Sequence, residues 1–310
     1  CTTSKGVKTY HTYTCYPIGY LLNRICGDRI QTISIQNGSD IQNANIVSNY
    51  QDIIDNTISL YYINGLEPYM TIYGDEILDS DASKVDLSAS SIYSFKRYTP
   101  VNVNGTVTYV ENPYYDGEMF AETNTYTNDL FLWLSPIGML SMAKQIYTNL
   151  SSNYAEQAAY FEENYKTLEN DLITLDAAYQ NLATTLVKEN KHIKFVSMTP
   201  SFGSWQKAYG IEVYPVCLSK YGALPTESEL QIIKDRIIAD KVEYIVYEPN
   251  MSEKMLDLFS NLEKELNLKR VNLSNISSLT TTQRTDNKDY LTLMYENLAV
   301  LNSIVSSEGE

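Results

Sequence analysis

Residues 155–188 have the sequence AEQAAYFEENYKTLENDLITLDAAYQNLATTLVK, in which apolar residues recur in alternating steps of four and three. This spacing predicts one long amphipathic helix with a continuous buried stripe. A dimeric coiled coil has a similar seam. We favour a helix that packs within one chain, because a strand pattern resumes directly after it, at residues 192–197. The stripe consists of Phe161, Tyr165, Leu168, Leu172, Leu175, Tyr179, Leu182 and Leu186.

Strand and helix patterns alternate on both sides of this helix. Before it, the buried run 58–63 ends at Asn64-Gly65, and Ser135-Pro136 supplies a helix N-cap followed by a first-turn proline. After it, Thr226 and Glu229 have the spacing of a capping box. Strands that alternate with helices predict parallel pairing, with helices on both faces of the sheet. We therefore expect an α/β fold of two lobes, each with a mainly parallel sheet flanked by helices, joined by one long backbone helix.

The order of these patterns also predicts the domain boundaries. With 310 residues, the chain is long enough for two separate cores. We expect a tether at residues 1–5, an N-terminal α/β lobe at 6–150, a linking helix at 151–190 and a C-terminal α/β lobe at 191–310. A linking helix of this length is expected to resist wide hinge motion between the lobes.

Charge and motif content exclude several classes of function. The formal net charge is −15 with only 23 Lys and Arg, whereas binding to nucleic acid rests on clustered cations. No stretch approaches the ~20 apolar residues that a membrane-spanning helix needs. The chain has no nucleophile elbow, phosphate loop or dinucleotide motif, and its two histidines, His11 and His192, lie far apart. We expect no enzymatic activity and no nucleic-acid partner.

Six motifs resemble, in the same order, those of the solute-binding lipoproteins of zinc and manganese ABC importers, of the metal-binding adhesion-lipoprotein type. They cover nearly the whole chain, and the resemblance implies a bilobed α/β fold of the periplasmic-binding type. The motifs are Thr12 to Tyr20 with Ile25 to Ile30, Ile63-Asn-Gly-Leu-Glu67, Trp133-Leu-Ser-Pro136, Phe202-Gly203 with Tyr209-Gly210, Tyr247-Glu-Pro249, and Tyr290 to Leu298.

The four positions at which that family holds its metal carry other residues here. The family has three histidines, or two and a glutamate, and an aspartate; this chain aligns Gln42, Phe131, Thr199 and Ser274 with them. Zinc and manganese need imidazole, thiolate or carboxylate ligands, and a phenyl ring supplies none. The resemblance therefore implies the family's scaffold with a degenerate metal site. We expect no cofactor, and zinc or manganese only if a shifted site exists.

Several occupants of the inter-lobe cleft remain open. Neighbours of the four positions are Asn64, Glu67, Trp133, Trp205 and Glu248. A tyrosine-rich insert before Trp133 favours an organic or cationic ligand, although Tyr is abundant elsewhere, 27 in all. A shifted metal site and a surface scaffold or adhesion protein without ligand are the alternatives. Candidate carboxylates for such a shifted site are Asp40, Glu67, Asp116, Glu118 and Glu248.

The first four residues, Cys1-Thr-Thr-Ser4, resemble the start of a mature bacterial lipoprotein. A diacylglyceryl group on Cys1 would anchor the protein in a lipid bilayer, since two acyl chains suffice for stable attachment. We expect a monomer on the outer face of the bacterial cytoplasmic membrane, with an ABC permease or a cell-surface molecule as partner. Cys15, Cys26 and Cys217 lack the spacing of a metal site and are predicted to be buried.

Overall fold

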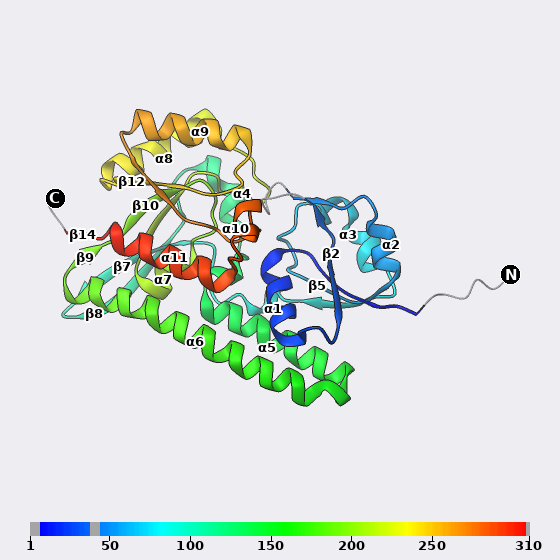
Figure 1. Ribbon diagram of the computed structural model, residues 1–310. Coiled ribbons are helices and arrows are strands. Elements are labelled where there is room, and N and C mark those ends of the chain that lie inside the picture. Colours follow the sequence, from blue (N-terminus) through cyan, green and yellow to red (C-terminus); the bar gives the residue numbers. More distant parts are fainter. Residues whose placement is uncertain (1–6, 38–43, 308–310) are drawn as a thin grey trace.

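The computed structural model describes residues 7–37 and 44–307, and these residues form two α/β lobes along one long helix (Figure 1). The helix is α6 (Ala158–Lys188), which is continuous and buries all eight residues of the predicted stripe. It packs on α5 (Pro136–Asn153) and α1 (Tyr16–Cys26) at one end and on α7 (Ser204–Tyr209) at the other. The predicted fold class is confirmed. Within the described residues, no helix is both long and apolar enough to cross a membrane.

The first lobe contains a four-stranded, fully parallel sheet in the order β2-β1-β5-β6. Pro17 lies in the first turn of α1, where a missing N–H costs nothing. Strand β5 is buried along almost its whole length, as the apolar run at 58–63 predicted. The elements of this lobe are β1 (Tyr10–Tyr13), β2 (Gln31–Ser34), β3 (Gln36–Asn37), β4 (Asn45–Ile46), α2 (Tyr50–Asp55), β5 (Thr57–Tyr62), α3 (Met70–Leu78), β6 (Ser83–Asp86) and η2 (Ser88–Ser90).

The second lobe repeats the arrangement with a parallel sheet in the order β11-β10-β12-β13. The capping box of Thr226 and Glu229 is present at the start of α8, and the side chain of Ser252 caps α9. The elements of this lobe are β9 (Lys191–His192), β10 (Lys194–Ser197), β11 (Glu212–Pro215), α8 (Glu227–Ala239), β12 (Tyr244–Tyr247), α9 (Glu253–Glu265), β13 (Lys269–Asn272), α10 (Thr281–Thr285), α11 (Tyr290–Ser303) and β14 (Ser306–Ser307).

A segment between the lobes in sequence packs on the second lobe in space. It contains an antiparallel hairpin of β7 (Arg97–Val103) and β8 (Thr106–Asn112), which the sequence patterns did not reveal. Phe95, Tyr114 and Tyr115 of this segment share a hydrophobic core with strands β10, β11 and β12. The predicted N-terminal lobe, 6–150, includes this segment by sequence, although its aromatic residues lie in the core of the second lobe. Short elements that complete the chain are η3 (Glu118–Phe120), α4 (Ala121–Asn124), η4 (Leu132–Leu134) and η5 (Ala155–Gln157).

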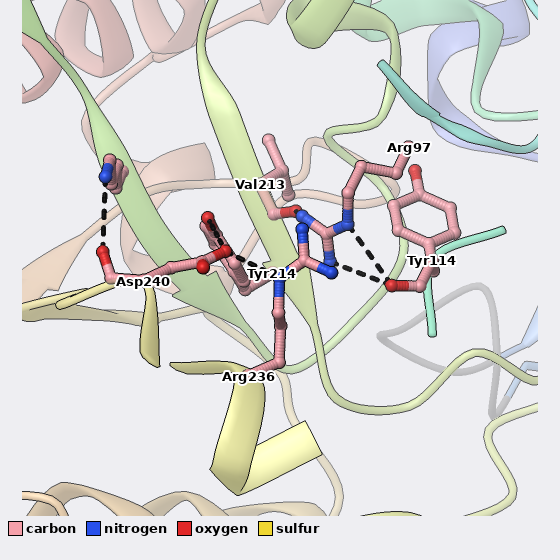
Figure 2. A network of polar contacts seen from close by, with 7 residues as sticks. Arg97, Tyr114, Val213, Tyr214, Arg236 and Asp240 are labelled. Atoms are coloured by element: carbon pink, nitrogen blue, oxygen red, sulfur yellow. Dashed lines mark hydrogen bonds and ion pairs between the residues drawn. The ribbon is translucent and has the colours of Figure 1, made fainter. Parts of the chain in front are cut away.

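The buried guanidinium of Arg97 attaches this hairpin to the second sheet (Figure 2). Its Nε and Nη2 donate to the carbonyl oxygen of Tyr114 at 3.2 and 3.1 Å, and Nη1 donates to that of Val213 in β11 at 3.2 Å. The ring of Tyr214 lies under the guanidinium, 4.5 Å from its carbon to the ring centroid. Carbonyl dipoles and an aromatic face thus replace the water that a buried cation loses.

Candidate functional site

Two of the four predicted ligand positions lie in loops at the carboxyl ends of strands in the second sheet. Thr199 follows β10 and Ser274 follows β13, while Phe131 precedes η4. Gln42 and Asp40 lie outside the described residues. Thr199, Ser274 and Phe131 are all buried. A chain of contacts connects Phe131 with Thr199 and runs through Trp133, Asn275 and Glu248.

Thr199 is hydrogen-bonded to Glu248, a buried carboxylate that follows β12. The hydroxyl of Thr199 donates to Oε1 of Glu248 at 2.5 Å, and the N–H groups of Met198 and Thr199 both donate to Oε2 at 3.0 Å. Nδ2 of Asn275 donates to Oε1 at 3.0 Å. Glu248 therefore accepts four hydrogen bonds, which is how a buried carboxylate is stabilised without a cation. We infer a structural role for Glu248 at this position.

Ser274 is held by Asn297 on α11. The N–H of Ser274 donates to Oδ1 of Asn297, and Nδ2 of Asn297 donates to the carbonyl oxygen of Ser274, both at 2.9 Å. Oγ of Ser274 accepts the N–H of Ile276 at 3.1 Å. Ile276 has a φ of 56°, a conformation that costs free energy for a β-branched residue and persists only where the surroundings enforce it. The hydroxyl of Ser274 thus stabilises a strained turn.

Phe131, Trp133 and Trp205 belong to one hydrophobic core. The rings of Phe131 and Trp133 pack edge to face with centroids 5.7 Å apart. The indole N–H of Trp133 donates to the carbonyl oxygen of Asn275 at 2.7 Å, and that of Trp205 donates to the carbonyl oxygen of Leu134 at 2.8 Å. Both tryptophans, which the sequence placed beside the cleft, are fully buried and tie η4 to the second lobe.

Glu67 occupies the equivalent place in the first lobe, after β5. Its Oε1 accepts the hydroxyl of Thr14 at 2.5 Å and the N–H of Ile63 at 2.9 Å, but its buried Oε2 has no partner among the described residues. Burial raises the pKa of Glu67 to about 7. Asn64 is exposed, and its N–H donates to Asp86. In the second lobe, both carboxylate oxygens of Glu248 accept hydrogen bonds. In the first lobe, only one oxygen of Glu67 does so among the described residues.

Asp129 is a buried carboxylate that the sequence reasoning did not select. Oδ1 accepts the N–H of Phe131 at 3.0 Å, and Oδ2 has no partner among the described residues. Burial raises the pKa of Asp129 to about 7. Its side chain lines a cavity of about 10 Å³ together with Ser204 and Phe131, about the size of a single water. The signal in the sequence was its position two residues before Phe131, where an Asx turn forms.

Replacing Asp129 with asparagine is expected to stabilise the protein most above pH 7 and by about a third as much at pH 5. A raised pKa means that the unfolded state loses its proton first, so the parent loses stability as pH rises from about 4 to about 7. The asparagine variant does not lose stability in this way. A shift of three pKa units corresponds to a loss of roughly 4 kcal/mol or less. Urea unfolding at pH 5 and pH 8 measures it. A stability difference that is the same at both values would contradict the assignment.

The tyrosine-rich insert packs on the second lobe. Tyr114 and Tyr115 are fully or nearly fully buried in its core, and the hydroxyl of Tyr115 donates to the carbonyl oxygen of Pro215. Asp116 and Glu118 are exposed. Tyr114 and Tyr115 therefore contribute to the core of the second lobe.

The described residues contain no group of three or more His, Cys, Asp and Glu side chains that could hold a metal ion. His11 is buried, its Nε2 lies 2.8 Å from the hydroxyl of Tyr154, and burial lowers its pKa to about 4. Cys15, Cys26 and Cys217 are free and buried, as predicted. Burial raises the pKa of the Cys15 and Cys26 thiols, so they remain protonated.

This chain matches, over residues 12–304, the family described as zinc-uptake complex component A periplasmic. The zinc-binding lipoprotein AdcA of Streptococcus pneumoniae (strain ATCC BAA-255 / R6) is 26% identical over 181 residues, 58% of this chain and 35% of that protein. The high-affinity zinc uptake system protein ZnuA of Bacillus subtilis (strain 168) is 24% identical over 177 residues, 57% of this chain and 53% of that protein. The chain thus matches about a third to a half of the length of these relatives.

Solved structures share the fold. The periplasmic zinc-binding protein TroA from Treponema pallidum superposes with a TM-score of 0.73 at 16% identity, covering 96% of this chain and 99% of that one. The Zn(II)-bound ZnuA-like domain of Streptococcus pneumoniae AdcA gives 0.67 at 20% identity, covering 96% and 98%. The family match spans most of the chain, and each of these structures covers 96% of it. The chain belongs to the zinc-uptake component A family, a family of transport components and not of enzymes, as its motifs predicted.

Proposed function

We propose that this chain is the extracytoplasmic solute-binding component of an ABC importer of the zinc and manganese type, and that it does not capture either metal at the family's position. The description of its family as periplasmic, and of one relative as a lipoprotein, supports the location. Membership in an uptake complex supports a permease as partner. The lipid anchor at Cys1 remains a prediction.

One observation carries the proposal about the metal. Each of the three described ligand positions already has a structural partner: Phe131 packs on Trp133, the hydroxyl of Thr199 donates to Glu248, and Ser274 is clasped by Asn297. Binding a divalent cation requires several strong ligands that replace its hydration, and structural zinc sites draw roughly 10–16 kcal/mol from thiolates and imidazoles. The hydroxyl of Thr199 is neutral and already donates a hydrogen bond to Glu248, so it does not supply such a ligand.

The purified protein is therefore expected to contain no stoichiometric zinc or manganese and to give no binding heat with either ion at micromolar concentration. Elemental analysis after purification without chelator, followed by calorimetric titration with ZnCl2 and MnCl2, measures this. A 1:1 complex with a submicromolar dissociation constant that survives removal of surface-bound metal would refute the proposal.

Restoring the family's ligands is expected to create metal-dependent stability. The variant carries Gln42→His, Phe131→His, Thr199→His and Ser274→Asp, and its unfolding temperature is measured with and without zinc. We expect a rise on adding zinc, since three imidazoles and a carboxylate form a suitable set. Both unfolding temperatures come from the same variant. The stability lost by breaking the contact between Thr199 and Glu248 therefore cancels in their difference. The same four positions changed to alanine provide the control, which zinc should leave unaffected.

A further inference from the structure

The hairpin of β7 and β8 lies on the second lobe, away from the first lobe, and its two faces differ (Figure 1). Cross-strand pairs such as Val101 with Thr108 share a face. One face rests on α7, where Nζ of Lys207 lies over the ring of Tyr98. On this face Tyr98 is buried and Pro100, Val107 and Tyr109 are half-buried, whereas Asn102 and Glu111 are exposed. The other face carries β-branched residues, of which all but Thr99 are exposed: Thr99, Val101, Val103, Thr106, Thr108 and Val110.

Both ends of the hairpin are well defined: its first residue is fixed to the second lobe, and its turn has a favourable backbone conformation. Arg97 fixes the first residue of β7 to Val213 and Tyr114 (Figure 2). Asn104-Gly105 forms the turn with φ values of 52° and 84°, as in the two-residue turns that match strand twist. The strands are therefore held in place for pairing with another strand.

The outer edge of β7 is closed to such pairing. The N–H of Tyr98 donates to Oε1 of Gln206 at 3.2 Å, which shows that this group points away from β8. Because N–H groups alternate along an antiparallel strand, the position of Pro100 also faces outward, and proline has no N–H to offer. Proline on an edge is a common device against unwanted strand pairing.

The outer edge of β8 has no such protection. Tyr98 and Pro100 pair with Glu111 and Tyr109, so the N–H groups of Glu111, Tyr109 and Val107 point away from β7. Across the part of the chain that the structure describes, no acceptor meets these three groups. An edge with free donors and acceptors is a template for one further strand.

The charge of the chain indicates which strand fits. Residues 98–110 contain no charged side chain, and Glu111 is the only charged residue of β8, although the formal net charge of the molecule is −15. Two copies repel one another over most of their surface but approach at this hairpin with little repulsion. An antiparallel pair of identical edges is also self-complementary, as an interface with two-fold symmetry requires.

We infer that β8 pairs with β8 of a second copy of this chain, so that two hairpins form one four-stranded antiparallel sheet. One seven-residue strand from each copy buries little area, which predicts weak, concentration-dependent dimerisation. Salt strengthens the dimer, because it screens the repulsion between the bodies of the two copies. The inference replaces the expectation of a strict monomer and does not depend on the proposed transport role.

Sedimentation equilibrium of the full chain, from about 1 µM to about 1 mM, tests the inference in the range where weak complexes form. The average mass should rise from 35.3 kDa toward twice that value, and further in higher NaCl. Val107→Pro removes an outward N–H of β8 and should weaken association at least tenfold. Asn102→Pro is the matched control. Asn102 pairs with Val107, and its replacement by proline removes an outward N–H of β7 only.

A second pair of variants keeps every backbone donor. Thr108→Lys places a cation on β8 and should abolish the dimer, whereas Val101→Lys, at the paired position on β7, should leave most of it. Unchanged unfolding temperatures establish that each variant is folded. A monomer at every concentration, equal effects of the two proline variants, or equal effects of the two lysine variants would overturn the inference; the last outcome would indicate stacking of the valine faces.

Discussion

Replacing Glu248 with alanine is expected to lower the free energy of unfolding by about 3–5 kcal/mol. The side chain accepts hydrogen bonds from Met198 N–H, Thr199 N–H, the Thr199 hydroxyl and Asn275, all of them buried. Without the carboxylate these donors lose their acceptor, and each buried unsatisfied donor costs about 1–3 kcal/mol. Partial relaxation of the loops reduces the sum. Urea unfolding of the parent and the variant measures the difference.

Two further variants separate hydrogen bonding from packing. In Glu248→Gln the shape is retained, but either orientation of the amide turns its NH2 toward two donors, so a substantial part of the loss should persist. Glu67→Ala should cost clearly less, since Glu67 accepts only two hydrogen bonds, and its raised pKa shows that burial disfavours its charged form. Equal losses for Glu67→Ala and Glu248→Ala, or a glutamine variant as stable as the parent, would contradict the role given to Glu248.

Replacing Trp205 with alanine is expected to cost about 3–5 kcal/mol, the usual range for a buried tryptophan. The indole is fully buried and its ring packs on Tyr179 of α6, on Phe202 and on Phe195. Its N–H also binds the carbonyl oxygen of Leu134, so the variant leaves a cavity and an unpaired acceptor. Chemical denaturation, with the fluorescence of the remaining Trp133 as signal, measures the loss.

Trp205→Phe distinguishes a core residue from a ligand-contacting one. Phenylalanine retains most of the packing but not the N–H, so we expect about 1–3 kcal/mol of destabilisation from the smaller ring and the lost hydrogen bond. The competing possibility is that the indole of Trp205 lines an open cleft. In that case its truncation would lower the free energy of unfolding only slightly. A loss below about 1 kcal/mol for Trp205→Ala would therefore contradict its place in the core.

Local sequence patterns were sufficient wherever the physical cause was local. The stripe from Phe161 to Leu186 predicts α6 because residues three and four apart share one helix face. Ser135 and Thr226 predict helix starts because a side-chain oxygen satisfies an N–H only two or three residues away. The order of these elements, with the family's motifs, then gives the two parallel sheets and the bilobed fold.

Tertiary structure decided how the candidate site is used. The motifs predict four ligand positions, but the hydrogen-bond partners of Thr199 and Ser274 are Glu248 and Asn297, 49 and 23 residues away. Asp129 was missed, since a lone aspartate in a sequence gives no sign that burial will raise its pKa. Burial depends on all the elements that pack around a side chain, and no local pattern contains that information.

The sequence by itself therefore determined the fold class, the long helix and the helix caps, and it predicts that Phe131, Thr199 and Ser274 replace the family's metal ligands. Only the tertiary structure decided that the insert docks on the second lobe through Arg97, which bonds Val213 at a separation of 116 residues. It also decided which edge of the hairpin stays open. The physical reason is that such contacts are fixed by the packing of distant segments, whose partners a periodicity or a motif does not specify.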